Sequence, residues 1–245
     1  MTIIFLIYGL FIGSFLNVCI YRIPSGISIA YPPSSCGSCG HRLNYIDMIP
    51  VVNYIKNKGK CRYCGSPYSM KYPLIELLNG VLYAFIALKY GFTLTSIWYC
   101  LIISLLITIS IIDLKHKIIP DSLNIVGGIT GIIFIILEKT ILTDSLIGAG
   151  IGLGLFLLIA LITNAMGGGD IKLMAVLGLI FGVKGVLFIT LFSFVTGAVI
   201  SLVLLITKVK SRKDEIPFGP FISLSALMYI YFGNEIINWY LNIIM

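Results

Sequence analysis

The chain has 245 residues, of which 58% are hydrophobic and 11% are charged, and its formal net charge at pH 7 is +7. This composition excludes a soluble enzyme and is typical of a polytopic membrane protein. In such a protein an excess of basic residues is a topology signal, so we expect no nucleic-acid partner.

The first 21 residues are one apolar stretch, with no basic residue before Arg22. A secretory signal peptide has a charged start and a cleavage site of small residues, and neither feature is present. We therefore expect residues 1–21 to stay in the membrane as the first transmembrane helix.

The one sizeable polar segment, residues 22–72, contains two C-x-x-C pairs that are separated by 21 residues. This spacing is close to that of four-cysteine zinc sites. A lobe of about 50 residues with few aliphatic side chains forms only a small hydrophobic core, so it needs a bound metal ion or another cross-link for stability. The sequence predicts a structural zinc ion bound by Cys36, Cys39, Cys61 and Cys64.

Two other interpretations of these cysteines are a pair of disulfides and a redox dithiol. A reducing cytosol argues against disulfides, and no βαβ pattern supports a redox site. His41 is an alternative fourth ligand, and together with Lys60 and Arg62 it is expected to lower the pKa of the thiols. Cys19 and Cys100 lie in apolar stretches and are expected to be packing residues.

Apolar stretches continue to the end of the chain, and most have the roughly 20 residues that a membrane-spanning helix needs. A shorter one, 173–183, spans only if the bilayer is thinned or its helix extends through Asp170. The predicted fold is an all-α polytopic membrane protein of about eight transmembrane helices, with domains 1–21, 22–72 and 73–245. The eight stretches are 1–21, 74–91, 94–112, 118–137, 142–163, 173–183, 186–207 and 218–243.

The distribution of basic residues predicts the orientation. With the N-terminus outside, 14 of the 17 lysines and arginines fall in inner loops, and only Lys89, Lys139 and Lys184 fall outside. Inner loops of membrane proteins carry an excess of basic residues, so this orientation is favoured and places the cysteine lobe in the cytosol.

The segment Gly167-Gly168-Gly169-Asp170-Ile171-Lys172 interrupts sequence that is otherwise compatible with lipid. An ionised side chain at membrane depth costs about 3 kcal/mol on insertion scales. Each glycine weakens a helix by roughly 1 kcal/mol but lets backbone or substrate approach closely. A purely structural span would rarely combine these features, so we interpret the segment as an active-site loop with Asp170 as one half of a catalytic pair.

Asp113 is the candidate for the other half. It ends the stretch 94–112, which runs from outside to inside in the predicted topology, so it lies at the same membrane boundary as Asp170. Two carboxylates that meet within a few ångströms share one proton, and an aspartic protease uses such a pair as base and acid. The alternative for Asp113 alone is an interfacial ion pair with Lys115 or Lys117.

Two other acids are less easily assigned. Glu76 lies one turn inside the stretch 74–91 and is either an ion-pair partner or a weak candidate for substrate binding. Asp121 follows Pro120 and is expected to cap the next helix.

Together these segments resemble the prepilin peptidases (type IV leader peptidases), intramembrane aspartic proteases with a glycine-x-glycine-aspartate motif. The resemblance covers almost the whole chain and is carried by several separate motifs. These are Gly13 to Pro24, the two C-x-x-C pairs, Tyr72-Pro-Leu-Ile-Glu76, Asp113 through Pro120-Asp121, Gly167 to Lys172 and Ile216-Pro-Phe-Gly-Pro-Phe221.

The resemblance implies that Asp113 and Asp170 cut the short basic leader from type IV prepilins or pseudopilins at the cytosolic face of the bacterial inner membrane. It also implies that the new N-terminal residue is methylated with S-adenosylmethionine. No glycine-rich nucleotide loop occurs in residues 22–72, so methyl transfer is implied by the resemblance alone. The sequence does not indicate an oligomeric state.

A transporter that uses intramembrane acids for ion or proton coupling is the alternative function. Transporters place such acids near the bilayer midplane, in broken helices of two repeated halves. Here both acids are predicted at one face and no internal repeat is seen, so the peptidase is the favoured interpretation.

Overall fold

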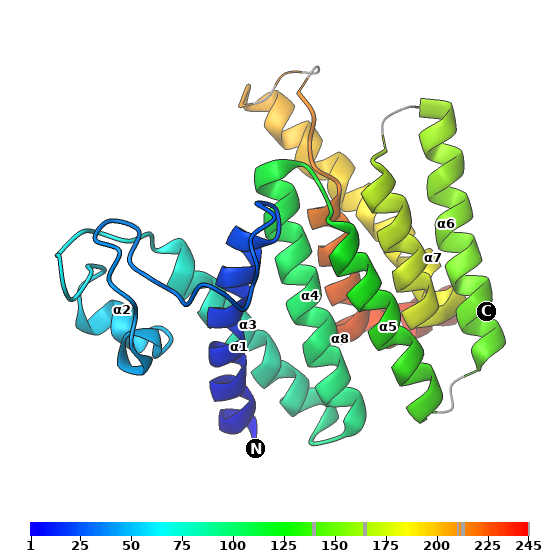
Figure 1. Ribbon diagram of the computed structural model, residues 1–245. Coiled ribbons are helices and arrows are strands. Elements are labelled where there is room, and N and C mark those ends of the chain that lie inside the picture. Colours follow the sequence, from blue (N-terminus) through cyan, green and yellow to red (C-terminus); the bar gives the residue numbers. More distant parts are fainter. Residues whose placement is uncertain (139–140, 164–165, 210, 212–213, 245) are drawn as a thin grey trace. The chain divides into compact units, whose positions relative to one another are not determined.

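The computed structural model describes residues 1–138, 141–163, 166–209, 211 and 214–244. Lys139, one of the three basic residues predicted on the outer side of the membrane, is not among these residues. Within these ranges there is no strand, and seven helices are long and apolar enough to cross a membrane, which confirms the predicted all-α polytopic fold. They are α1 (Thr2–Arg22), α3 (Lys71–Tyr90), α4 (Leu94–His116), α5 (Asp121–Glu138), α6 (Leu142–Thr163), α7 (Gly168–Ile206) and α8 (Gly219–Ile244), shown in Figure 1.

The chain divides into two compact units, residues 1–108 and 109–245. In the first unit, α1 and α3 pack together, and buried polar side chains link them to the middle of α4. The Asn79 amide donates to the Gly9 carbonyl at 2.7 Å, and the Ser104 hydroxyl donates to Asn79 Oδ1 at 3.0 Å. Polar groups at membrane depth need protein partners because lipid offers none, so this network fixes how the three helices pack.

The cysteine lobe lies between α1 and α3 and has little regular structure. It contains a short 3₁₀ helix, η1 (Tyr45–Met48), and one turn of helix, α2 (Val52–Lys56). Two isolated antiparallel bridges, Ser35 with Arg42 and Lys60 with Pro67, flank the two C-x-x-C pairs. The lobe is therefore built from loops around the cysteines, as its poor apolar content predicts.

Helix α7 folds back on itself at Gly182, whose φ of +67° and ψ of −168° are not helical. A Cβ built on Gly152 of α6 would contact both the Met174 main chain and the Val186 side chain. Twelve residues of a straight helix span about 18 Å, so these two positions can meet only if the chain reverses between them. The expected stretches 173–183 and 186–207 are therefore the two arms of α7, which explains seven helices in place of eight.

Contacts between loops gather one set of helix ends in the second unit. The Lys117 ammonium, just after α4, lies 3.1 Å from Glu215, which precedes α8. Lys172 in the first turn of α7 lies 2.8 Å from Asp121 at the start of α5. Because these contacts join the end of α4 to the beginnings of α5, α7 and α8, the segments that carry the predicted site share one end of the unit.

Candidate active site and metal centre

Asp113 lies in the last turn of α4 with 5% of its surface exposed. Its Oδ2 accepts a buried hydrogen bond of 2.8 Å from the backbone N–H of Gly219, the first residue of α8. Of the two lysines considered as its ion-pair partner, Lys115 and Lys117, the second is instead paired with Glu215. Asp113 is thus held by main chain from a segment 106 positions later rather than by a neighbouring cation.

Asp170 lies in the first turn of α7, where the positive end of a helix favours a carboxylate. Its Oδ2 accepts a hydrogen bond of 3.3 Å from the N–H of Gly167, the residue that precedes the helix. Its Oδ1 is buried and has no hydrogen-bond partner among the described residues. One oxygen is therefore fixed by the helix, and the other remains available for a proton or a substrate atom.

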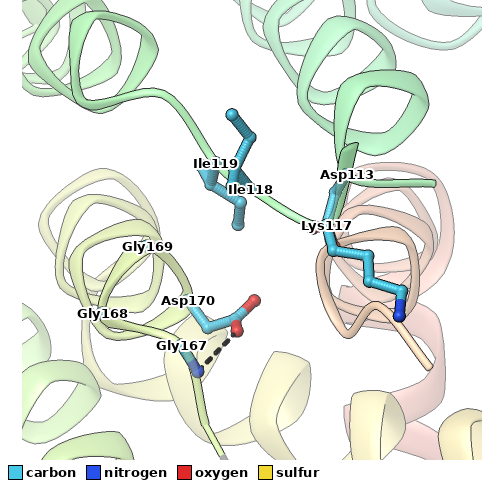
Figure 2. A pocket seen from close by; sticks show the side chains of 8 residues that line it. All are labelled: Asp113, Lys117, Ile118, Ile119, Gly167, Gly168, Gly169 and Asp170. Atoms are coloured by element: carbon cyan, nitrogen blue, oxygen red, sulfur yellow. Dashed lines mark hydrogen bonds between the residues drawn. The ribbon is translucent and has the colours of Figure 1, made fainter. Parts of the chain in front are cut away.

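The two carboxylates line one cavity of about 270 Å³ and interact electrostatically with each other. Figure 2 shows Asp113 at the end of α4 and Asp170 at the start of α7, on either side of the linker between α4 and α5. The other residues that line the cavity are Lys117, Ile118, Ile119, Gly167, Gly168 and Gly169. Acids from segments 57 positions apart thus come together in a pocket with an apolar wall.

The α4–α5 linker approaches the start of α7 very closely. A Cβ on Gly169 would lie 2.8 Å from Cβ of Ile119, which is closer than such atoms ever come, so this contact requires glycine. The side chain of Asn124 in α5, which is 5% exposed, donates to the Gly169 carbonyl at 3.4 Å. These contacts fix the backbone at Asp170 relative to the linker that follows Asp113.

Lys172, predicted as part of the active-site loop, is absent from the residues that line this cavity. Its ammonium lies 2.8 Å from both carboxylate oxygens of Asp121. The pair borders a neighbouring cavity of about 300 Å³, together with Asn124 and Ile125. The expectation that Asp121 caps α5 is wrong, because the helix begins at Asp121 itself and the side chain binds Lys172.

Glu76 is buried within α3, with 8% of its surface exposed. Its Oε2 accepts a hydrogen bond of 2.8 Å from the N–H of Val51 in the cysteine lobe, and the Ser14 side chain also hydrogen-bonds to the carboxylate, so neither partner is a cation. Val51 has a φ of +60°, which is rare for a β-branched residue and persists only where the surroundings hold it. Glu76 therefore ties the lobe to the helices.

The four cysteines of the lobe form a cluster that can hold a metal ion. Their Sγ atoms all lie within 4.8 Å of one another, and those of Cys36 and Cys64 are 3.9 Å apart. All four are free thiols, which excludes the two disulfides as alternatives in this structure. His41 is not in the cluster, and its ring lies against that of Tyr63, with the centroids 3.6 Å apart and the planes tilted by 32°.

Each C-x-x-C pair closes the same kind of turn. The N–H of Gly40 donates to the Cys36 carbonyl at 2.9 Å, and the N–H of Gly65 donates to the Cys61 carbonyl at the same distance. Both glycines have φ near +70°, a conformation that glycine adopts without steric cost. The two turns therefore present the thiols in pairs, as the spacing predicts.

Hydrogen bonds shift the pKa values of the thiols, rather than the nearby basic side chains that the sequence suggested. Backbone N–H groups of Cys39 and Ser38 lower the pKa of Cys36 to about 6. The Ser66 hydroxyl and N–H lower the pKa of Cys64. For Cys39 the His41 N–H favours the thiolate, but burial and the Cys36 and Cys64 sulfurs raise its pKa to about 11. These contacts therefore favour the thiolate at Cys36 and Cys64 and the thiol at Cys39.

Sequence reasoning did not identify Gly219 and Asn124 as parts of the site. The run Pro217-Phe-Gly-Pro220 contains three residues that shape the start of a helix, and this was the available signal for Gly219. Asn124 lies one turn after Asp121 in α5 and had no comparable signal.

Comparison with known proteins agrees with this arrangement. Residues 7–90 match the bacterial peptidase A24 N-terminal domain, and residues 100–202 match the type IV leader peptidase family. The chain is 35% identical to a prepilin leader peptidase/N-methyltransferase of Legionella pneumophila, over 97% of this chain and 94% of that protein. It is 34% identical to the protein of the same name from Bacillus subtilis, over 98% of both chains.

No solved structure is significantly similar to the chain. The first family match includes the cysteine cluster, in the lobe between α1 and α3, and the second includes both aspartates. The full-length relatives share both parts in one chain. This chain therefore belongs to the prepilin leader peptidase/N-methyltransferase family.

Proposed function

We propose that this protein is a membrane-embedded aspartic endopeptidase that removes the leader of type IV prepilins or pseudopilins with Asp113 and Asp170 as its catalytic pair. The observation that carries this proposal is the shared cavity: two acids from distant segments line one pocket at one end of the helices. The names of the relatives supply the substrate class.

The chemistry follows from two carboxylates that hold one proton between them. The ionised carboxylate removes a proton from water, and the resulting hydroxide attacks the scissile carbonyl carbon. The protonated carboxyl donates its proton to the carbonyl oxygen, which gives a tetrahedral diol. The diol then collapses: one of its hydroxyls returns a proton to the carboxylate that protonated the carbonyl oxygen, and the leaving nitrogen takes the proton that the other carboxyl accepted from water. The pair therefore again holds one proton.

The shape and place of the cavity support a peptide substrate that is anchored in the bilayer. A volume of about 270 Å³ is small for a drug-sized ligand and suits a short run of extended main chain. The site lies where α4 ends and α7 begins, and the positive-inside rule predicts that this end faces the cytosol, with the N-terminus outside. A substrate with a cytosolic leader and an apolar stem would present its cleavage site there.

The lobe of residues 22–72 is proposed to bind structural zinc and to take part in N-methylation, with residues 73–245 as the peptidase domain after a first helix at 1–21. Tetrahedral zinc with Zn–S bonds of about 2.3 Å has sulfur–sulfur edges of about 3.8 Å. The 3.9 Å between Cys36 and Cys64 fits that edge. S-adenosylmethionine is proposed as the methyl donor because the relatives are named N-methyltransferases.

The transporter alternative receives no support from the geometry. The acids lie at helix ends on one side of the second unit, and coupling sites in transporters lie near the midplane between repeated halves. A peptidase therefore accounts better for their position.

The proposal is tested by incubating the purified protein in lipid with a prepilin and S-adenosylmethionine. Mass spectrometry of the product's N-terminus reads both activities at once. We expect loss of the leader mass and, on the new N-terminal residue, a gain of one methyl group. An intact substrate after incubation with folded, zinc-containing enzyme would refute the peptidase proposal, and a cleaved but unmethylated product would refute the transferase proposal.

A further inference from the structure

We infer that the amino end of α8, Phe218-Gly219-Pro220, is a positioning element of the catalytic site, and that the Gly219 N–H orients Asp113 for catalysis. This inference rests on the proposed role of Asp113 and Asp170. Its structural basis is the buried hydrogen bond of 2.8 Å from the Gly219 N–H to Asp113 Oδ2.

The Gly219 N–H is available to Asp113 because it has no partner within its own helix. The first N–H groups of a helix lack the carbonyl that would lie one turn earlier. The next residue, Pro220, has no N–H, and the N–H groups of Phe221 and Ile222 both bond to the Phe218 carbonyl. Gly219 therefore supplies the one donor of this turn that points at the carboxylate.

The start of α8 is also held rigidly in place. The Phe218 ring lies 5.2 Å from that of Phe194 in α7, 6.1 Å from that of Phe156 in α6 and 5.9 Å from that of Phe221. Such aromatic contacts, with centroids 4.5–7 Å apart, favour defined ring arrangements. The donor that meets Asp113 is thus anchored by two neighbouring helices.

This arrangement assigns the shared proton to particular oxygens. A backbone N–H can only donate, so the oxygen that it contacts must act as an acceptor. Oδ2 of Asp113 faces the Gly219 N–H, and Oδ2 of Asp170 faces the Gly167 N–H. These contacts therefore favour Oδ1 of one aspartate or the other as the atom that carries the proton of the pair, because the more basic, unprotonated oxygen is the better acceptor for an N–H. Both carboxylates are oriented by helix N-termini, one by its own helix and one by α8.

Position 219 also has no room for a side chain. A Cβ there would lie 2.7 Å from Asp113 Oδ2 and 3.3 Å from Asp113 Cβ. Any other residue must push the carboxylate aside by several tenths of an ångström. Displacements of this order at a reacting group reduce rates by roughly 10- to 100-fold.

The test uses two variants of the full-length protein in lipid nanodiscs. Replacing Gly219 with glycolic acid by cell-free suppression changes its amide to an ester, which removes the N–H and adds no atoms. Gly219→Ala keeps the N–H and adds the Cβ. The matched control is Gly128→Ala in α5, where a Cβ would meet nothing within 4 Å.

We expect kcat for prepilin cleavage to fall about 100-fold in the ester variant, as for loss of an active-site donor, and at least 10-fold in Gly219→Ala. In both, KM and zinc content should match those of the Gly128→Ala control, and each variant should be fully folded at the assay temperature even though loss of a buried hydrogen bond lowers its unfolding midpoint. A purely structural role would instead leave part of the protein unfolded at that temperature or raise KM. An ester variant with kcat within twofold of wild type, or a loss of rate that equals the fraction of unfolded protein, would overturn the inference.

Asp113→Asn is measured in the same assay to separate this inference from the proposed function. If Asp113→Asn cleaves at the wild-type rate, the catalytic pair is wrong and the role of Gly219 fails with it. If Asp113→Asn is inactive and the ester variant is fully active, the catalytic pair stands and the positioning role of α8 is wrong.

Discussion

The reversal of α7 depends on Gly182, so Gly182→Ala is a sharp test of the fold that places the site. The residue has φ +67° and ψ −168°, a region that is populated almost only by glycine. It lies directly against the Asp144 carboxylate of α6, which a Cβ would meet. The substitution thus adds backbone strain and displaces a neighbouring side chain.

The size of the effect follows from a comparison of two glycines. Forcing a non-glycine residue into this region costs about 1–3 kcal/mol. At Gly150 in α6, which is helical and has nothing within 4 Å of a Cβ, alanine should instead be favourable by up to about 1 kcal/mol. Gly182→Ala should therefore be less stable than Gly150→Ala by roughly 1–4 kcal/mol, the sum of these two effects.

Reversible unfolding in mixed micelles, followed by circular dichroism, measures this difference. The double variant Gly182→Ala/Asp144→Ala separates the causes, because it relieves the contact with Asp144 but leaves the backbone strain. We expect it to recover only part of the loss relative to Asp144→Ala alone. Equal stabilities of Gly182→Ala and Gly150→Ala would refute the reversal at Gly182.

Three further predictions concern the lobe and its attachments. Cys39→Ser should abolish stoichiometric zinc binding, measured by elemental analysis, and increase proteolysis of residues 22–72, measured by limited digestion. Full zinc occupancy in that variant would contradict a four-thiolate site. After zinc is removed, the pKa of Cys36, about 6, makes this residue a thiolate at pH 7, so its alkylation should be fast at pH 7 and become slow as the pH falls below 6. Cys39, with a pKa of about 11, should be alkylated slowly across the same pH range. Peptide mapping that found the reverse order of alkylation would contradict the assigned hydrogen bonds. Glu76→Ala should destabilise the docked lobe by about 1–3 kcal/mol because the Val51 N–H loses its acceptor. Glu76→Gln keeps a carbonyl oxygen and should therefore destabilise the lobe less. Equal rates of lobe proteolysis for the two variants would count against the contact.

Much of this architecture was predictable because it depends on local sequence. Membrane-spanning stretches are recognised by their length and apolar content, and the cysteine cluster is recognised by the spacing of two C-x-x-C pairs. Asp170 stood out because a carboxylate behind three glycines is costly in a membrane helix. These features need no knowledge of which helix contacts which.

The contacts that complete the site were not predictable because they join distant main-chain groups. Gly219 donates to an acid 106 positions earlier, and Glu76 accepts from Val51 across 25 positions. The run 217–220 marks the start of a helix, but a backbone N–H does not specify its acceptor, so neither pairing could be read from the sequence. The pairing of Lys172 with Asp121 likewise depends on how α5 meets α7.

The central claim is that Asp113 and Asp170 act together on one scissile bond. The most direct measurement is single-turnover cleavage of a prepilin by Asp113→Asn and by Asp170→Asn, each confirmed by circular dichroism to be folded in lipid and to retain zinc. Because one proton is shared by the pair, we expect each variant alone to lose cleavage by at least about 1,000-fold, and the double variant to lose no more. Cleavage within tenfold of wild type by either folded single variant would contradict the paired mechanism.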